Sequence, residues 1–349
     1  MRLYLLVFFL GAFFISTAQD TVKVNTNITP DEQAQQHYND GIIALNKGEG
    51  QVAADLFSKS IALKPDFDKA YYNRCVAFTM VRNYPSAMSD INKVLSNGPN
   101  NIDARFAKAM VFFGQGQKDS TNRWLDNTLG IGKHAEAYYY KGIMSYQAGD
   151  YNEAIKDYSG AIEIKPDYAY AYNDRASSKR AINDLTGAIA DYEKALSLNP
   201  SFVFIYNNLG SVYRVSKNYD KAIEYYTKAM NAKPEYLLAL NNRGAAKLES
   251  GKLEDAKKDF EDVLKKDPKN SSAFNNLASV ALKQKDYKKA KDMANKAIEL
   301  NANNGGAYFN RGIARQMLRE DDGCCDDWKK ALDLGVIAAK SFIGSDCNQ

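Results

Sequence analysis

The sequence predicts an all-α solenoid made of nine helix-turn-helix units. Three observations support this: a 34-residue period from Ala34 to Leu334, small residues at two fixed positions of every unit, and proline at a third position in most of them. A chain with this period stacks one supersecondary unit on the next, because a single unit cannot bury its apolar face alone.

The unit boundaries follow from aligning the chain with itself. The units span residues 34–67, 68–101, 102–134, 135–168, 169–202, 203–236, 237–270, 271–304 and 305–334. Positions are counted below from the first residue of each unit. The third unit is one residue short and carries four glycines, so we expect a softer joint there, between units one to two and units four to nine.

Positions 8 and 20 are small in every unit. Position 8 is Gly, Ala or Cys, and position 20 is Ala except for Thr121 in the third unit and Cys324 in the ninth. Two helices approach closely only where both lack bulk, so these positions mark where the first helix of a unit (helix A) crosses the second (helix B). Large apolar residues at positions 4 and 24 are expected to fill the space around the crossing.

Position 32 is predicted to end helix B. It is proline in six units: Pro65, Pro99, Pro166, Pro200, Pro234 and Pro268. Proline lacks the amide proton that a helix interior needs, so it turns the chain toward the next unit.

These columns resemble the tetratricopeptide repeat (TPR) family. The resemblance rests on motifs such as the run from Tyr206 to Gly210, followed by Tyr219, Ala222, Tyr226, Ala229 and Pro234. It implies a right-handed superhelix whose A helices line the concave side. It implies little about the partner, because one scaffold serves many functions.

The start of the chain predicts export. Residues 1–18 hold a positive Arg2, an apolar run from Leu3 to Ile15 and small residues before Gln19, which is the pattern of a signal peptide. An uncleaved membrane anchor is the alternative. No cysteine follows the apolar run, which excludes a lipoprotein anchor there. Residues 19–33 are polar and aperiodic, so we expect a flexible lead-in, and we expect the mature protein in the periplasm or secreted.

The end of the chain predicts a cap. Residues 335–349 form a capping helix, expected over Val336 to Ile343, and a tail with Cys347. Because Cys324 fills a crossing site and Cys325 points away from it, we expect a Cys325–Cys347 disulfide; Cys324 as the partner, or no disulfide, is the alternative. A cysteine-containing last repeat with such a cap is similar to exported bacterial TPR proteins.

Composition narrows the function classes. The formal charge of +4 falls to +3 without Arg2, and the lysine pairs of helix B lie beside acidic residues, which indicates a solvated face rather than nucleic-acid binding. No later stretch has the length and apolar character of a transmembrane helix, so no stable membrane insertion is expected after signal cleavage. The oligomeric state stays open.

The inventory of reactive groups predicts no enzyme. The only histidines are His37, at a packing position, and His134, in a glycine-rich turn, and Cys324-Cys325 lacks the spacing of a metal or redox pair. We therefore expect no catalytic residue, no metal and no cofactor.

Position 6 suggests a binding surface. An asparagine amide both donates and accepts, so a row of asparagines on the concave side would match the backbone of an extended peptide. The row resembles the asparagine ladder of O-linked N-acetylglucosamine transferases; local hydrogen bonding is the equal alternative. The continuous part is Asn208, Asn242, Asn276 and Asn310, with Asn73 further toward the N-terminus.

Position 5 divides the expected groove. It is aromatic in the first four units, with Tyr38, Tyr72, Phe106 and Tyr139, and it is asparagine in the next four, with Asn173, Asn207, Asn241 and Asn275. An aromatic trough would hold apolar side chains of a partner, whereas the alternative packs these rings between helices. Position 7 adds a row of Arg and Lys that borders the packing face, so these cations either pair with neighbouring acids or face a ligand.

The sequence thus predicts a non-catalytic scaffold or adaptor in the cell envelope that binds an extended protein segment in the groove. Two competitors remain: an assembly or regulatory subunit that docks folded partners by its edges, and a carbohydrate-binding protein, since Tyr and Asn also suit sugars.

Overall fold

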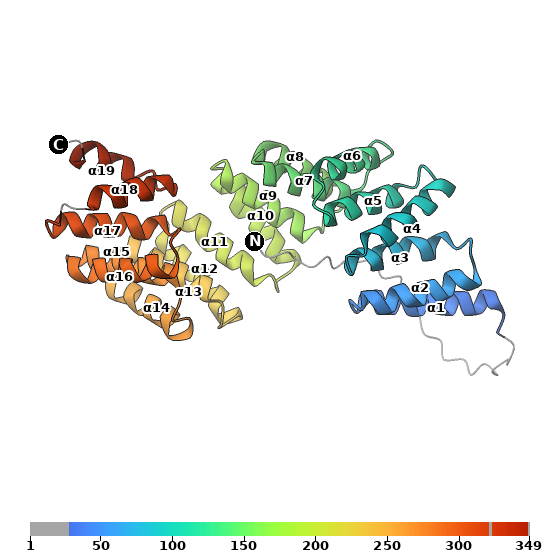
Figure 1. The fold of residues 1–349 in the computed structure, drawn as a ribbon, viewed down its shortest axis with the longest axis horizontal. Coiled ribbons are helices and arrows are strands. Elements are labelled where there is room, and N and C mark those ends of the chain that lie inside the picture. Colours follow the sequence, from blue (N-terminus) through green and yellow to red (C-terminus); the bar gives the residue numbers. More distant parts are fainter. Residues whose placement is uncertain (1–27, 321–322, 348–349) are drawn as a thin grey trace. The chain divides into compact units, whose positions relative to one another are not determined.

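The computed structural model describes residues 28–320 and 323–347, and these residues form nineteen α-helices and no strand (Figure 1). The predicted signal peptide and residues 19–27 of the predicted lead-in lie outside the described residues. The chain divides into two compact units at Ala171 and Tyr172. The division lies in the fifth repeat, whereas the softer joint was expected in the third.

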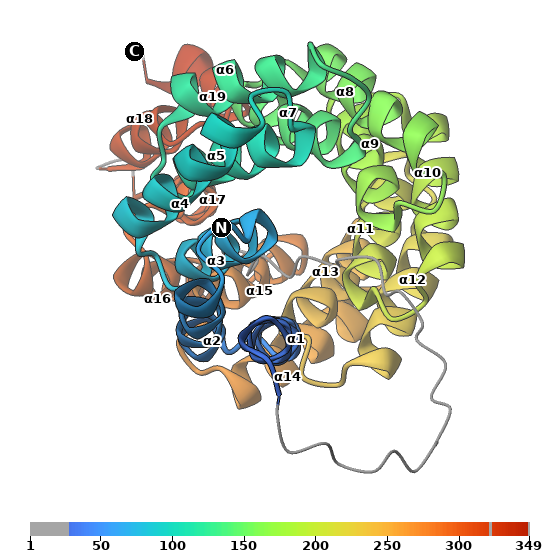
Figure 2. The ribbon, with the colours of Figure 1, turned by 90° about the vertical axis from the view of Figure 1, so that its right-hand side faces the viewer.

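The first compact unit contains four helix pairs. Its helices are α1 (Pro30–Asn46), α2 (Gly50–Leu63), α3 (Asp68–Met80), α4 (Tyr84–Asn97), α5 (Ile102–Gly114), α6 (Lys118–Leu129), α7 (Ala135–Ala148) and α8 (Tyr151–Ile164). Helix α9 (Ala169–Ala181) contains the division. Figure 2 shows the pairs α1/α2, α3/α4 and α5/α6 following one another.

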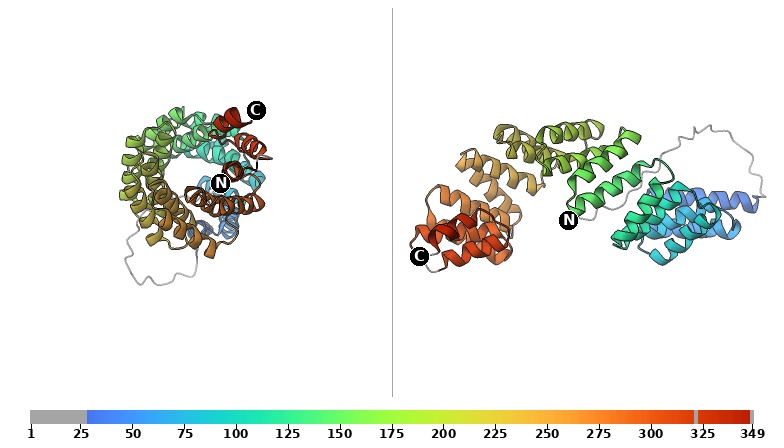
Figure 3. Two further views of the ribbon diagram at one scale, coloured as in Figure 1. Left: turned by 90° about the vertical axis from the view of Figure 1, so that its left-hand side faces the viewer. Right: turned by 90° about the horizontal axis from the view of Figure 1, so that it is seen from above.

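The second compact unit continues the pattern. Its helices are α10 (Leu185–Leu198), α11 (Val203–Val215), α12 (Tyr219–Ala232), α13 (Leu237–Glu249), α14 (Leu253–Lys266), α15 (Ser271–Lys283), α16 (Tyr287–Leu300), α17 (Gly305–Met317), α18 (Cys324–Asp333) and α19 (Ala339–Asp346). Within this unit, the A helices of successive repeats touch one another, α11 on α13, α13 on α15 and α15 on α17. The stacked pairs are seen in yellow to red in Figure 3.

The helices begin where the repeat alignment begins each unit, with one exception. Helix α1 starts at Pro30, so four residues of the predicted lead-in are helical. The side chain of Thr29 accepts a hydrogen bond from the Glu32 backbone, and the Glu32 side chain accepts one from the Thr29 backbone at 2.8 Å. This capping box satisfies helix-start amides that periodicity alone does not reveal.

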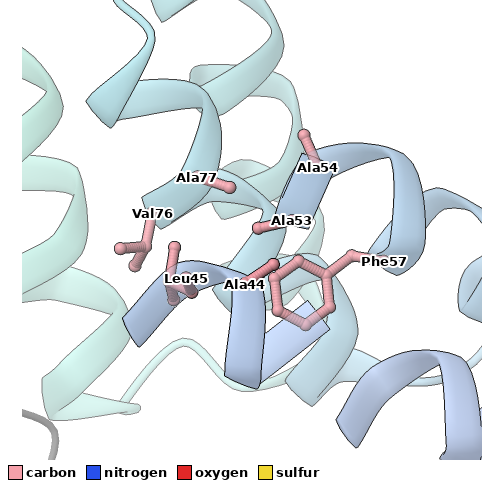
Figure 4. Packing of buried hydrophobic residues seen from close by; sticks show 7 residues of the cluster. All are labelled: Ala44, Leu45, Ala53, Ala54, Phe57, Val76 and Ala77. Carbon is pink, nitrogen blue, oxygen red and sulfur yellow. The ribbon is translucent and has the colours of Figure 1, made fainter. Parts of the chain in front are cut away.

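Small residues let each A helix meet its B helix. Where position 8 is glycine, the ring at position 24 lies directly on it: a Cβ on Gly210 would come within 2.7 Å of the Tyr226 ring. Position 20 is fully buried, as at Ala53 and Ala222. Figure 4 shows this packing in the first compact unit, where Phe57 and Ala53 lie against helices α1 and α3.

The turn between helices A and B has a left-handed residue at position 15 in all nine repeats. Four of these residues are glycine and five are not: Gly48, Arg82, Gly116, Gly149, Asn183, Lys217, Gly251, Lys285 and Arg319. Glycine adopts this backbone without strain and asparagine tolerates it, so the four turns with Arg or Lys hold a residue in a conformation that its side chain disfavours.

The last repeat is covered by a short helix. Helix α19 begins at Ala339, three residues after the predicted start, because a turn joins it to α18. Phe342 packs against Phe309 and Trp328, with ring centroids 5.2 and 5.1 Å apart. Cys325 and Cys347 form a disulfide in the structure, with Cα atoms 5.6 Å apart, while Cys324 is a buried thiol.

Candidate interaction surface

The asparagines of positions 5 and 6 bond to each other between repeats. Each position-6 amide nitrogen donates to the position-5 side-chain oxygen of the preceding repeat. The bonds are Asn208 to Asn173 at 3.3 Å, Asn242 to Asn207 at 2.9 Å, Asn276 to Asn241 at 3.0 Å and Asn310 to Asn275 at 2.8 Å. The asparagine track, as we call these eight residues, therefore joins neighbouring repeats of the second compact unit.

Each bond leaves a donor and an acceptor unused. Among the described residues, the amide nitrogens of Asn207, Asn241 and Asn275 have no hydrogen-bond partner, and the only fully buried side-chain nitrogen or oxygen without one is Trp328 Nε1. These three amide nitrogens therefore reach solvent, although Asn207 as a whole is only 6% exposed, whereas Asn241 and Asn275 are half-buried. The side-chain oxygens of Asn208, Asn242 and Asn276 are likewise without partners in this part of the chain. The track thus presents one donor and one acceptor per repeat.

Three predicted groove asparagines are less available than the sequence suggested. Asn310 is buried and its amide nitrogen also donates to Ser279 Oγ at 2.9 Å. Asn173 donates to Asp174 at 2.8 Å. Asn73 is buried, and its nitrogen donates to the Tyr38 hydroxyl and the Lys69 carbonyl, each at 3.0 Å. Their N–H groups serve packing between and within helices.

The aromatic residues of position 5 pack inward, which corrects the expected open trough. Phe106 is only 3% exposed and lies 4.6 Å from the His134 ring, so it has no surface for a partner. Tyr38 and Tyr139 are half-buried, and each packs on the aromatic residue that ends its own repeat. The ring centroids of Tyr38 and Phe67 are 4.9 Å apart, as are those of Tyr139 and Tyr168. A ring at position 5 fills the space at the start of the next A helix, where a polar side chain would leave a void.

Tyr72 is enclosed in the same way. Burial raises the pKa of its hydroxyl well above the usual value, with a smaller contribution from the charge of Asp103. Tyr72 and Phe106 also line a cavity of about 10 Å³ with Cys75 and Met110, which is barely room for one water molecule. Burial raises the pKa of the Cys75 thiol to about 12, so this thiol is inert near neutral pH.

The arginines of position 7 are held between helices by a residue that the sequence analysis missed. A buried aspartate at position 23 accepts both arms of the guanidinium group, as Asp259 does from Arg243 at 2.9 and 2.7 Å. The same arginine donates to Thr227 of the preceding repeat at 3.3 Å. The other pairs are Arg74 with Asp90, Arg175 with Asp191 and Arg311 with Asp327.

The sequence contains a signal for these Arg–Asp pairs, which we call the ionic clamp of positions 7 and 23. Every repeat with arginine at position 7 has aspartate at position 23, and in three of these repeats a second cation at position 11 contacts the same carboxylate, as Lys247 does at 2.9 Å. The fourth repeat departs from this pattern. Its Lys141 reaches Asp126 of the preceding repeat at 2.7 Å, so buried Asp157 keeps only a 3.2 Å hydrogen bond from Ser145.

Family models match much of the second compact unit. A TPR repeat model matches residues 142–179 and 176–215, and two tetratricopeptide repeat models match residues 203–269 and 247–310. The chain is a tetratricopeptide repeat protein. TPR stacks bind protein partners, so in this general sense the chain is a protein-interaction scaffold.

Curated relatives support the family over short stretches. The TPR protein is 25% identical over 114 residues to the TPR repeat-containing protein MJ1428 of Methanocaldococcus jannaschii, and 37% identical over 52 residues to tetratricopeptide repeat protein 36 of Mus musculus. The first match spans 33% of this chain and 20% of the archaeal protein. The second spans 15% of this chain and 28% of the mouse protein.

Solved structures share the fold. A tetratricopeptide repeat protein from Parabacteroides merdae is similar with a TM-score of 0.65 at 18% identity, covering 72% of this TPR protein and all of that chain. The Cut9–Hcn1 hetero-tetramer of APC/C gives a TM-score of 0.54 at 15% identity, covering 89% of this chain and 75% of that one. In residues 28–320 and 323–347 there is no group of three metal-ligating side chains and no helix with the length and apolar character to cross a membrane.

Proposed function

We propose that this TPR protein is a non-catalytic, exported scaffold whose asparagine track binds an extended segment of another protein. The observation that carries the proposal is the unused donor and acceptor that each Asn–Asn bond leaves in successive repeats. A peptide backbone has one donor and one acceptor per residue, so such a row holds a chain without demanding particular side chains.

The bonds between repeats also favour this role. Because each position-6 amide is fixed by its position-5 neighbour, little side-chain freedom remains to be lost on binding. Leu238, at position 2 of helix α13, is 52% exposed. It offers an apolar contact beside the polar track. Affinity would then come from backbone hydrogen bonds with a few apolar anchors.

The test separates binding from folding by using aspartate rather than alanine. Asn241→Asp and Asn275→Asp, both at half-buried positions, keep the oxygen that accepts from the next repeat but replace the free donor with a carboxylate oxygen. We expect the double variant to unfold at nearly the same temperature as the wild type and to lose at least tenfold in affinity for captured peptides, measured in high salt to screen the added charge.

The control is Asn231→Asp, which adds a charge at an exposed position of α12 outside the track. If the double variant and this control bind peptides as the wild type does, the track is not the binding surface.

Export is the second part of the proposal. Disulfides persist in oxidising compartments, so the Cys325–Cys347 pair supports the signal-peptide pattern of residues 1–18. The envelope fraction of cells that express the full chain should contain a protein that begins at Gln19. An intact Met1 or a wholly cytosolic protein would contradict export.

A further inference from the structure

Gly306 lies directly beside the unused donor of Asn275. A Cβ on Gly306 would come within 3.2 Å of the Asn275 amide nitrogen and within 3.4 Å of its side-chain oxygen. Gly306 is the second residue of α17 and is not one of the left-handed glycines, so its backbone does not require glycine. What the glycine provides is open space at the Asn275 amide, because any side chain here would begin in contact with that amide.

The corresponding place in the other repeats is position 2, which follows each position-5 asparagine by 31 residues. In chain order the residues at this place are Phe204, Leu238, Ser272 and Gly306. Asn173 and Asn207, which precede the two large residues, are 7% and 6% exposed, whereas Asn241 and Asn275 are half-buried. The exposure of each asparagine therefore follows the size of the side chain at position 2 of the next repeat.

We propose that position 2 determines which asparagines of the track a partner reaches, so that a bound segment is held at Asn241 and Asn275. Ser272 and Gly306 leave the amide nitrogens of these two residues open. The inference rests on the proposed function and narrows the binding surface to the end of the track at α13 and α15. Further toward α9, the larger side chains at position 2 keep the asparagines for bonds between repeats.

The space at Gly306 also defines the chemistry of the partner. Asn275 is half-buried, so a main-chain carbonyl group that accepts from its amide nitrogen must approach α17 closely. Two chains approach closely only where both lack bulk. The bound segment is therefore extended and carries glycine, alanine or serine at the residue that lies over Gly306.

The experiment uses the mature chain and a bead-bound library of random linear peptides. We expect the wild type to select peptides with Gly, Ala or Ser at one preferred place. Gly306→Leu should weaken binding of a selected peptide at least tenfold, and Gly306→Ala should weaken it less, because alanine covers less of the amide. Both residues favour a helix more than glycine does, so loss of α17 would not explain a loss of affinity; thermal unfolding of the variants checks this.

Ser272→Leu tests the same rule at Asn241 without adding an atom beside Asn275, and it should also weaken binding at least tenfold. The matched control is Ser197→Leu, which adds leucine at an exposed position of α10, a B helix outside the track. This control should change neither the selected peptides nor their affinity.

The outcomes separate this inference from the proposed function. Unchanged binding by the two position-2 leucine variants, together with loss of binding by Asn241→Asp with Asn275→Asp, would refute control by position 2 and leave the asparagine track in place. Selected peptides without a preference for small residues would overturn the chemistry assigned to the partner. If the library yields no peptide, the proposed function fails together with this inference.

Discussion

At the residue scale, the crossing of helices α11 and α12 tolerates no added atom at Gly210. A Cβ on Gly210 would lie 2.7 Å from the Tyr226 ring, which is itself fully buried. We expect Gly210→Ala to lower the free energy of unfolding by about 1–3 kcal/mol, because the ring has no free space to move into. Chemical denaturation measures this. Gly344→Ala, with open space around it, is the control and should not destabilise the chain.

Buried Asp157 makes stability depend on pH. Burial raises its pKa to about 6, from the ordinary value of 3.8, and Lys141 offsets this only in part. The folded state therefore holds the proton more tightly than the unfolded state, so stability falls as pH rises from about 4 to 6. We expect Asp157→Asn to stabilise the chain by about 1–2 kcal/mol at pH 7.5 and to have almost no effect at pH 3.5.

Asp259→Asn provides the opposite comparison. It leaves Arg243 and Lys247 without their buried partner, so it should destabilise the chain by about 3–5 kcal/mol at neutral pH. Denaturation curves of both variants at several pH values measure the two changes in the free energy of unfolding. Equal effects of the two substitutions would mean that the missing arginine in the fourth repeat has no consequence.

The sequence predicted some single residues well and others poorly. The small residues at positions 8 and 20 were predicted because sterics act on each residue alone. The inward packing of Phe106 was not, because position 5 faces the groove in a single helix and becomes enclosed only when the next repeat docks. The bonds of Asn242 and Asn276 likewise depend on a neighbour 35 residues away.

At the element scale, the turns between helices A and B store strain. Lys285 has a φ of 62°, and Gly251 in the preceding repeat has a φ of 84°. We expect Lys285→Gly to raise the free energy of unfolding by up to about 1 kcal/mol, and Gly251→Ala to lower it by a similar amount. Thermal unfolding of the two variants provides the check. Destabilisation by Lys285→Gly would show that the lysine side chain contributes more than its backbone strain costs.

The capping helix depends on its covalent link. Cys325 and Cys347 are 22 residues apart, and closing such a loop restricts the unfolded chain by roughly 3 kcal/mol. We expect Cys347→Ser to destabilise the last repeat by about 2–4 kcal/mol. Peptide mapping without reductant should show Cys325 joined to Cys347 and Cys324 alkylated only after unfolding. A disulfide that contains Cys324 would contradict this pairing.

At the scale of the whole molecule, stability should be local. Each repeat contacts mainly its neighbours, so a defect in one repeat spreads only a short distance. We expect Asp259→Asn to increase hydrogen exchange in α13 and α14 and to leave α3 and α4 as protected as in the wild type. A uniform loss of protection along the chain would instead indicate a single cooperative unit.

The fold was predictable almost to the residue, because helix starts and crossings repeat nine times, proline stops repeat six times, and each copy supports the others. The division at Ala171 was not, since no residue type marks it. The ionic clamp of positions 7 and 23 was visible as a correlated pair, whereas its second partner in the preceding repeat, such as Thr227 for Arg243, has no fixed residue type.

The Asn–Asn bonds also bear on how the number of repeats can change. The residue that donates and the residue that accepts are the same in three successive interfaces, between Asn207 and Asn242, Asn241 and Asn276, and Asn275 and Asn310. Excision of residues 237–270 would bring Asn276 opposite Asn207 and rebuild an identical bond. Duplication of the same stretch would do likewise. This part of the protein is therefore suited to gain or lose whole repeats, in evolution or by design, with the track shortened or lengthened by one donor and one acceptor each time.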